Sequence, residues 1–188
     1  FSNVPILTKK NYIQEYSFAD RSWDGTLQGH ALLAMSSGTS GKPTIWPRGV
    51  YQEAEAAFTH EFLLTDLYDI DKYQTLMVIG FPMGIYVSGL ATAIPSLLTA
   101  LRHPNLSVVT PGNNKDSVLS FLKSMQKQYE QVILVGHPFF IKDVIETGKE
   151  EGITWPTMRV RTMFCSEGFN EVWRTYVATL LHTNSTQT

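Results

Sequence analysis

The sequence predicts an α/β fold in which a parallel sheet is flanked by helices. From position 75 onwards, short apolar runs alternate with amphipathic stretches, and turns that contain Gly or Pro separate them. Short apolar runs bounded by turn signals are typical of buried strands, and this alternation is typical of parallel sheets with helices on their faces. A Gly- and Ser-rich loop between two further short apolar runs precedes this region and predicts a hairpin.

Length and composition limit the class of protein. With 188 residues, of which 43% are hydrophobic and 17% charged, the chain can bury a sizeable core and fits one domain or a large piece of one. The net charge is −2 and no basic cluster exceeds Lys9-Lys10, so we expect neither a nucleic-acid partner nor a membrane anchor. The single cysteine, Cys165, excludes an internal disulfide and suits the cytoplasm, and the five scattered histidines predict no zinc motif.

Two parts are expected along the chain. Residues 1–30 form an entry segment, in which Thr8 is the N-cap candidate of a short helix over residues 9–15 and residues 20–29 form a connection. Residues 31–188 form the α/β part, which we expect to be incomplete at its C-terminus. Within it, residues 32–35 and 44–46 are the strands of the hairpin, and the second strand is expected to end at Pro47.

The helix expected over residues 50–67 has apolar positions at three- and four-residue spacing, which predicts a face that lies on the sheet. These positions are Ala54, Ala57, Phe58, Phe62 and Leu63. Residues 75–101 carry no charge, so a transmembrane helix must be considered. Because Gly and Pro interrupt this stretch, a buried strand, a loop and a buried helix fit it better.

The rest of the chain alternates between strands and helices. We expect strands at residues 76–79, 106–109, 132–135 and 159–164, and helices at residues 115–129, 139–148 and 170–181. Three loops follow strands and precede helices, at residues 80–84, 136–140 and 165–168. Because the carboxyl ends of parallel strands share one edge of a sheet, these loops should surround one crevice.

Side chains in these loops allow more than one role. Phe81, Met83, Phe139 and Phe140 fit either an apolar pocket or ordinary packing. For His137, a hydrogen-bonded structural role is the better interpretation. Cys165 has no adjacent histidine or lysine that would activate its thiol, so we assign it no catalytic role.

The loop of the hairpin reads Ser36-Ser37-Gly38-Thr39-Ser40-Gly41-Lys42-Pro43. Its two glycines, four hydroxyls and one lysine can offer backbone N–H groups, O–H donors and a cation to one multiply charged anion, which is the chemistry of a phosphate cradle. A plain hairpin turn or a flexible linker is the alternative. The Walker A pattern fails, because Ser36 stands at its first glycine and Pro43 at its Ser/Thr.

These eight residues closely resemble the phosphate-binding signature of the adenylate-forming superfamily, [ST]-[SG]-G-[ST]-[ST]-G-x-P. Among those enzymes the chain looks most like the phenylacetate-CoA ligase and CapK-like group, which carries a segment similar to residues 4–10 ahead of the loop. The matched segments run from Val4 to Glu171. The resemblance therefore implies the amino-terminal part of the large N-terminal domain of such a ligase, whose whole length would be roughly twice that of this chain or more.

In that superfamily, a substrate carboxylate attacks the α-phosphate of ATP, with Mg²⁺, to give an acyl-adenylate and pyrophosphate, and a thiol such as coenzyme A then takes the acyl group. The resemblance implies such a reaction with a small acid, aromatic acids included. It makes Lys42 and Thr39 the catalytic candidates. It assigns the phosphates to Ser36, Ser37, Gly38, Thr39, Ser40, Gly41 and Lys42, the nucleotide side to Ser166, Glu167 and Gly168, and the acyl pocket to Phe81, Met83, Gly84, His137, Phe139 and Phe140.

Some features of the superfamily are absent from the sequence. Its G-[GA]-E-P loop appears as Cys165-Ser166-Glu167-Gly168, without the leading glycine and the proline, and no Tyr-Gly-x-[ST]-[ED] motif follows. We therefore expect the chain to be inactive alone. An acyl-protein synthetase of the same superfamily and a non-catalytic binding module remain alternatives, and a homodimer through exposed apolar surface is compatible with the sequence.

Overall fold

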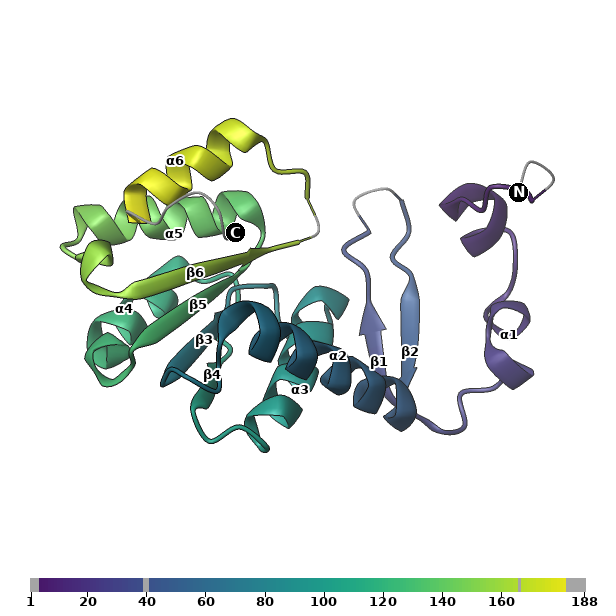
Figure 1. Cartoon of the computed structure of the whole chain (residues 1–188). Helices are drawn as coiled ribbons and strands as arrows, with labels where there is room; N and C mark the ends of the chain where they lie inside the picture. The colour runs from purple at the N-terminus through teal and green to yellow at the C-terminus, as the bar shows by residue number, and fades with distance from the viewer. Residues whose placement is uncertain (1–3, 39–40, 166, 182–188) are drawn as a thin grey trace.

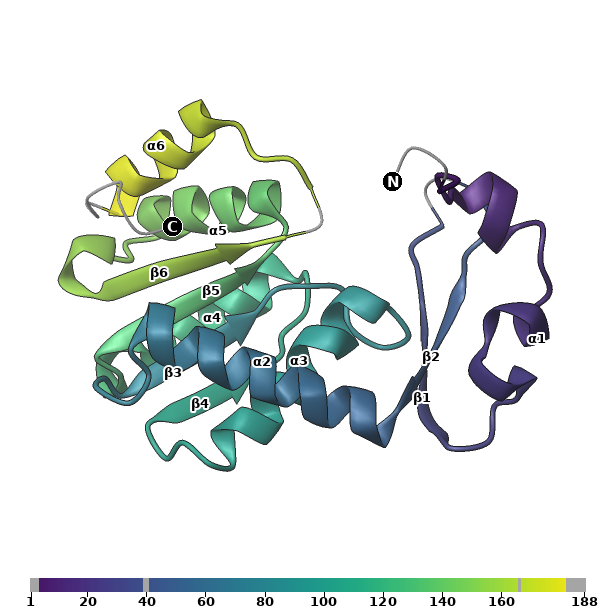
Figure 2. The same cartoon turned by 45° about the vertical axis from the view of Figure 1, so that its right-hand side comes forward.

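A four-stranded parallel sheet forms the centre of the protein. The computed structural model describes residues 4–38, 41–165 and 167–181. The strand order in the sheet is β4-β3-β5-β6. A two-stranded antiparallel hairpin, β1 (His30–Met35) and β2 (Ile45–Gly49), stands beside the sheet, and the N-terminal segment lies on the far side of the hairpin (Figures 1 and 2). The predicted fold class is confirmed.

The elements of the α/β part lie close to their predicted positions. The strands of the sheet are β3 (Thr75–Ile79), β4 (Leu106–Val109), β5 (Gln131–Gly136) and β6 (Arg159–Phe164). The helices are α2 (Val50–Tyr68), α3 (Val87–Ala100), α4 (Lys115–Met125), α5 (Pro138–Glu150) and α6 (Glu171–Leu181). The region 75–101 thus forms β3, a loop and α3. Within the described ranges, no helix has both the length and the apolar character that a membrane crossing requires.

Both faces of the sheet are covered. Leu76 and Val78 of β3 pack into a core with residues of α4, α5 and α6, while Met77 and Ile79 pack into a second core with residues of α2 and α3. The residues of β5 alternate in the same way between the two cores. Burial on both faces explains why these strands read as continuous apolar runs.

The face of α2 that meets the core differs from the predicted one. Ala57, Leu64 and Tyr68 are its buried residues, whereas Phe58 is 71% and Phe62 65% exposed. Ala54 is exposed as well, and Leu63 is partly buried against the core. Helical spacing shows which residues share a face, but not which of two apolar faces packs inward. The small Ala57 lies where α3 comes close, since Thr99 Oγ1 donates to the Ala57 carbonyl at 3.3 Å.

The hairpin and the entry segment also differ in detail from the prediction. Strand β2 does not end at Pro47 but continues to Gly49, with Pro47 opposite Leu33 of β1. A proline is tolerated there because a two-stranded sheet leaves the outer edge of each strand free of ladder hydrogen bonds. Thr8 caps a helical turn at Lys9–Ile13, as predicted. The expected connection at 20–29 instead begins within a short helix, α1 (Phe18–Arg21), which Ser17 caps.

A cluster of ion pairs joins α2 to the turn after α3. Glu61 accepts from Arg102 and, through Oε1, from His103 Nε2 at 2.8 Å, while His103 Nδ1 lies 2.8 Å from Asp71 Oδ1. Since both ring nitrogens face carboxylates, both donate when the ring is protonated. The hydrogen bonds from Arg102 and His103 lower the pKa of Glu61 to about 2, and the hydrogen bond to Glu61 raises the pKa of His103.

We expect this cluster to stabilise the protein most between about pH 4.5 and 6.5, the ordinary pKa values of Glu and His. The contribution of His103 is fully present below its unfolded-state pKa and is lost as pH rises through its raised folded-state pKa. The contribution of Glu61 is present above 4.5 and is lost as pH falls towards about 2. Thermal unfolding of His103→Gln across pH should therefore show a weaker alkaline loss than the wild type.

The matched control for this experiment is His60→Gln on α2, the helix that carries Glu61, where the histidine ring bonds to the Ala56 carbonyl. This variant should keep the wild-type dependence on pH. If His103→Gln and His60→Gln gave the same profile, the stabilising role of the protonated His103 ring would be refuted.

Candidate functional site

The loops that follow β3, β5 and β6 lie side by side at the carboxyl edge of the sheet. The Gly80 N–H donates to the Val135 carbonyl at 2.7 Å, and the Cys165 N–H donates to the Gly136 carbonyl at 3.4 Å. Because these bonds continue the ladders beyond the strands, the segment at 80–84, the junction of β5 with α5 at 136–140 and Cys165 are neighbours in space. The predicted loop at 136–140 is shorter than expected, since Gly136 ends β5 and α5 begins at Pro138. The structure thus brings together the three segments that the sequence places at one edge.

A glycine allows two of these loops to approach closely. A Cβ atom on Gly80 would lie 2.5 Å from Phe140 Cε1 and 3.2 Å from the Val135 carbonyl oxygen. Real Cβ atoms do not come so close to a ring, so any side chain at position 80 must displace Phe140. The glycine therefore fixes where the Phe140 ring lies at the sheet edge.

The predicted acyl-pocket residues do not form one group. Phe81 is fully buried in the core beneath α2 and α3, where its ring packs edge-on against His137 at 5.1 Å between centroids. Phe139 is 52% exposed and its ring centroid lies 6.4 Å from that of Trp173 on α6. Packing in the core and against α6 thus accounts for these two rings. Met83 and Gly84 stay in the loop after β3, His137 joins β5 to α5, and Phe140 lies in the first turn of α5.

His137 is not the satisfied structural histidine that the sequence suggested. Its Nδ1 is buried and has no hydrogen-bond partner among the described residues. A buried ring nitrogen without a partner is costly, and such atoms are usually satisfied by water or by a ligand. His137 therefore offers a polar atom at the sheet edge for a bound group.

The loop of the hairpin is closed at its base by two hydrogen bonds. The Ser36 N–H donates to the Thr44 carbonyl at 2.9 Å, and the Thr44 N–H donates to Ser36 Oγ at 2.9 Å. Inside this ring the Gly41 N–H donates to the Gly38 carbonyl at 2.9 Å. Gly38 has a φ of +74°, and a Cβ atom there would lie 2.9 Å from Pro43 Cγ, so the loop requires glycine at this position.

The remaining residues of the predicted phosphate and nucleotide sets lie at the surface. Ser37, Gly41 and Lys42 are exposed, as are Glu167 and Gly168 after β6. No carboxylate within the described ranges pairs with the Lys42 ammonium group. Thr39, Ser40 and Ser166 lie outside the described residues.

The hairpin is joined to the edge of the parallel sheet. The Met35 N–H, at the end of β1, donates to the Ile85 carbonyl at 2.7 Å, and Met35 forms a parallel bridge with Tyr86. Ile85 follows directly on the loop at 80–84, so the Gly-rich loop begins one residue beyond a contact with the sheet edge. One hydrogen bond and one bridge thus connect the hairpin to the segment after the loop at 80–84.

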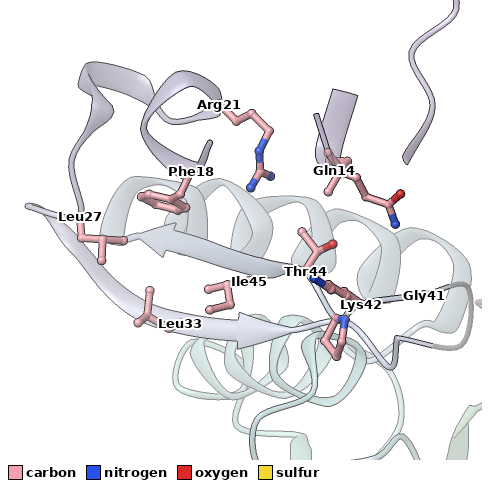
Figure 3. Close-up of a pocket in the computed structure, with 11 residues that line it drawn as sticks. Gln14, Phe18, Arg21, Leu27, Leu33, Gly41, Lys42, Thr44 and Ile45 are labelled. Carbon is pink, nitrogen blue, oxygen red and sulfur yellow. The ribbon is translucent and has the colours of Figure 1, made fainter. Parts of the chain in front are cut away.

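A cavity of about 750 Å³ separates the hairpin from the N-terminal segment (Figure 3). Lys42 and Gly41 of the loop line it, together with Gln14 and Arg21. The sequence analysis did not identify Gln14 or Arg21, because their position depends on how the N-terminal segment packs against the hairpin. A local signal for α1 is present, since Ser17 and Asp20 have the spacing of a capping box.

Side chains that could bind a metal do not gather within the described ranges. No group of three or more His, Cys, Asp or Glu residues there has the arrangement of a metal site. This finding concerns a metal site made of protein side chains alone, whereas Mg²⁺ that accompanies ATP is usually bound by one or two carboxylates and the phosphates; we derive no step through that ion.

The close approach of Gly80 to the Phe140 ring predicts how a substitution at position 80 affects stability. Gly80→Ala should destabilise the protein by roughly 1–3 kcal/mol, because the new methyl group must displace Phe140. Gly168→Ala is the matched control, since a Cβ atom there meets nothing within 4 Å. Urea denaturation of both variants measures the difference, and equal stabilities would contradict the close packing of these loops.

No family model matches the chain, and no curated protein matches it either. Solved structures share its fold. A structure of 2-hydroxyisobutyryl-CoA ligase with 2-HIB-AMP and CoA in the thioesterification state matches with a TM-score of 0.73 and 16% identity, over 96% of this chain and 38% of that chain. An open conformation of the same ligase matches with a TM-score of 0.68 and 15% identity, over 96% and 41%.

A structure of the ligase in the postadenylation state with 2-HIB-AMP gives a TM-score of 0.72 at 16% identity, over 96% of this chain and 37% of that chain. The chain thus spans about two fifths of the length of the ligase chains it matches. At such identity the likeness shows the fold alone. The chain has the fold of part of an adenylate-forming CoA ligase.

Proposed function

We propose that the protein containing this chain uses ATP to activate a small carboxylic acid as an acyl-adenylate and then forms a thioester with coenzyme A. The observation that carries this proposal is the contact of Met35 with Ile85 and Tyr86. It joins the hairpin that bears the Gly-rich loop, with its phosphate-binding signature, to the segment that follows the loop at 80–84. The fold likeness to a CoA ligase supports the reaction class. The chain, with its segment at residues 4–10, looks most like the phenylacetate-CoA ligase group, and aromatic acids are therefore the first substrates to test.

The Gly-rich loop fits a phosphate group. The Gly38 conformation leaves no room for a side chain beside Pro43, and Lys42 supplies a cation without a competing carboxylate among the described residues. The Gly41 N–H is bonded to the Gly38 carbonyl. Donation from Gly41 to a phosphate therefore requires this bond to open, so the loop must rearrange when the nucleotide binds.

We assign the binding site of the carboxylic acid substrate to the carboxyl edge of the sheet. Met83 and Phe140 supply apolar surface there, and the buried Nδ1 of His137 supplies a polar atom to orient a carboxylate. Phe81 acts indirectly, as the buried ring against which His137 packs. Phe139 is left out of the proposed pocket because it lies against Trp173.

The acceptor of the acyl group is proposed to be coenzyme A, since the similar fold belongs to a CoA ligase. A protein thiol is the alternative acceptor. Consumption of free coenzyme A in the presence of ATP and the acid separates the two, because an acyl-protein synthetase leaves coenzyme A unchanged.

Lys42→Ala should lower the rate of pyrophosphate release by the full-length protein by roughly 10²-fold, since a positioned charge on the phosphates contributes on that scale. The assay is pyrophosphate release with ATP and a panel of aromatic and short aliphatic acids. Lys127→Ala removes the same charge from a residue that lines a different surface hollow, and it should leave the rate unchanged.

Two results would count against the proposed function. One is the absence of pyrophosphate release with every acid by folded wild-type protein that binds ATP. The other is an equal rate for Lys42→Ala and the wild type, which would remove the Gly-rich loop from the reaction.

A further inference from the structure

The cavity between the hairpin and the N-terminal segment has a polar side and an apolar side. Phe18, Leu27, Leu33 and Ile45 gather at one end, whereas Gln14, Lys42 and Thr44 gather at the other (Figure 3). At about 750 Å³, its volume is within the usual range of small-molecule sites. This division suits a ligand with one polar end and one apolar body.

The aliphatic side chains at the apolar end are about half exposed. Leu33 of β1 is 49% and Ile45 of β2 52% exposed, although both point into the cavity. Leu27, which precedes β1, is 48% exposed. Covering such surface with an apolar group is favourable by about 25 cal/mol per Å² of area removed from water. The cavity therefore attracts an apolar body.

Two cations line the cavity, Lys42 at the polar end and Arg21 on the wall that α1 forms. Arg21 Nε donates to the Tyr16 carbonyl at 3.1 Å, which holds the guanidinium so that it extends from α1 towards the hairpin (Figure 3). Lys42 lines the same cavity. Within the described ranges, neither cation pairs with a carboxylate. A guanidinium whose Nε is already bonded still has N–H groups that match the two oxygens of a carboxylate.

The amide of Gln14 completes the polar end. Its Nε2 would lie 3.2 Å from a Cβ atom on Gly41, so the amide sits directly at the Gly-rich loop. Gln14 follows the helical turn that Thr8 caps, and this turn holds it in place. Two cations and an amide donor can neutralise and orient one anionic group.

From this juxtaposition, we propose that the cavity binds a monocarboxylate with an apolar body, Arg21 and Lys42 receiving the carboxylate and Leu33 and Ile45 the body. A bulky polyphosphate fits less well, because six of the lining residues are apolar: Ile13, Phe18, Leu27, Leu33, Pro43 and Ile45. This binding site is distinct from the acid site proposed at the sheet edge, and it does not rest on the adenylation reaction.

Binding at this cavity would be coupled to the Gly-rich loop through Lys42. The same ammonium group is assigned to the phosphates in the proposed function, and it cannot neutralise two anions at once. An acid in the cavity should therefore weaken the binding of ATP, and ATP should weaken the binding of the acid by the same factor.

The probe for this site is hexanoate, followed by ligand-observed NMR titration of the full-length protein without ATP. Hexanoate should bind saturably, whereas the neutral hexanamide and the short acetate should bind at least about fivefold more weakly, since each lacks one of the two matched features. Arg21→Gln and Leu33→Asn should each weaken hexanoate binding about fivefold or more.

Matched controls test whether these effects are local. Arg174→Gln removes an arginine from α6, and Leu101→Asn replaces a leucine that is 83% exposed at the end of α3. Both should bind hexanoate as the wild type does. Circular dichroism and thermal unfolding confirm that each variant is folded before it is titrated.

Three outcomes would overturn the proposal. These are no saturable binding of hexanoate, equal binding by Arg21→Gln, Leu33→Asn and their controls, or loss of binding in Met83→Asn alone, which would place the acid at the sheet edge. Since the readout is binding and not turnover, a protein that releases no pyrophosphate would contradict the proposed function and leave this test intact.

Discussion

The burial of β3 and β5 on both faces is the constraint on which the rest of the structure depends. Their side chains fill two cores, one under α2 and α3 and one under α4, α5 and α6. Strands with no free face can offer functional groups to a ligand only at their ends. Gly80 and Gly84 therefore follow β3, and His137 follows β5, at the carboxyl edge of the sheet. The close contact of Gly80 with Phe140, and the buried Nδ1 of His137, both follow from this crowding at the carboxyl edge.

The Gly-rich loop lies outside this crowded region. It closes a two-stranded hairpin whose link to the sheet includes the bond from Met35 to Ile85 and the start of α2 (Figure 2). The hydrogen bonds between Ser36 and Thr44 close the loop on itself, while the bond from Met35 to Ile85 helps to position the hairpin beside the sheet. Residues within the loop, such as Gly38 and Pro43, therefore fix its conformation. Residues distant in sequence determine what lies next to it.

The sequence was sufficient to predict the type and bounds of elements whose hydrophobic periodicity is strong and whose ends carry turn residues. Strands β4 and β6 have the predicted bounds, β3 begins one residue earlier than predicted, and β5 extends one residue further at each end. Sequence periodicity could not tell that Ala57 and not Phe58 meets the core, or that Phe139 lies against Trp173, because both depend on packing between helices distant in sequence. The sequence likewise did not predict that Arg21 lines the hairpin cavity, because this depends on how the N-terminal segment packs against the hairpin. Local chemistry predicted the loop, and tertiary packing decided its surroundings.

Charge is distributed unevenly around these features. In the α/β part, most of the basic side chains near the helices meet a carboxylate: Arg102 pairs with Glu61, Lys115 with Asp143, Lys123 with Glu151 and Lys142 with Glu146. Lys42 and Arg21, on opposite walls of the hairpin cavity, form no such pair with the described residues. In a chain of net charge −2, two such cations beside a Gly-rich loop make a local positive field that attracts anions. The hairpin therefore has an electrostatic preference for anions that its fold likeness alone does not explain.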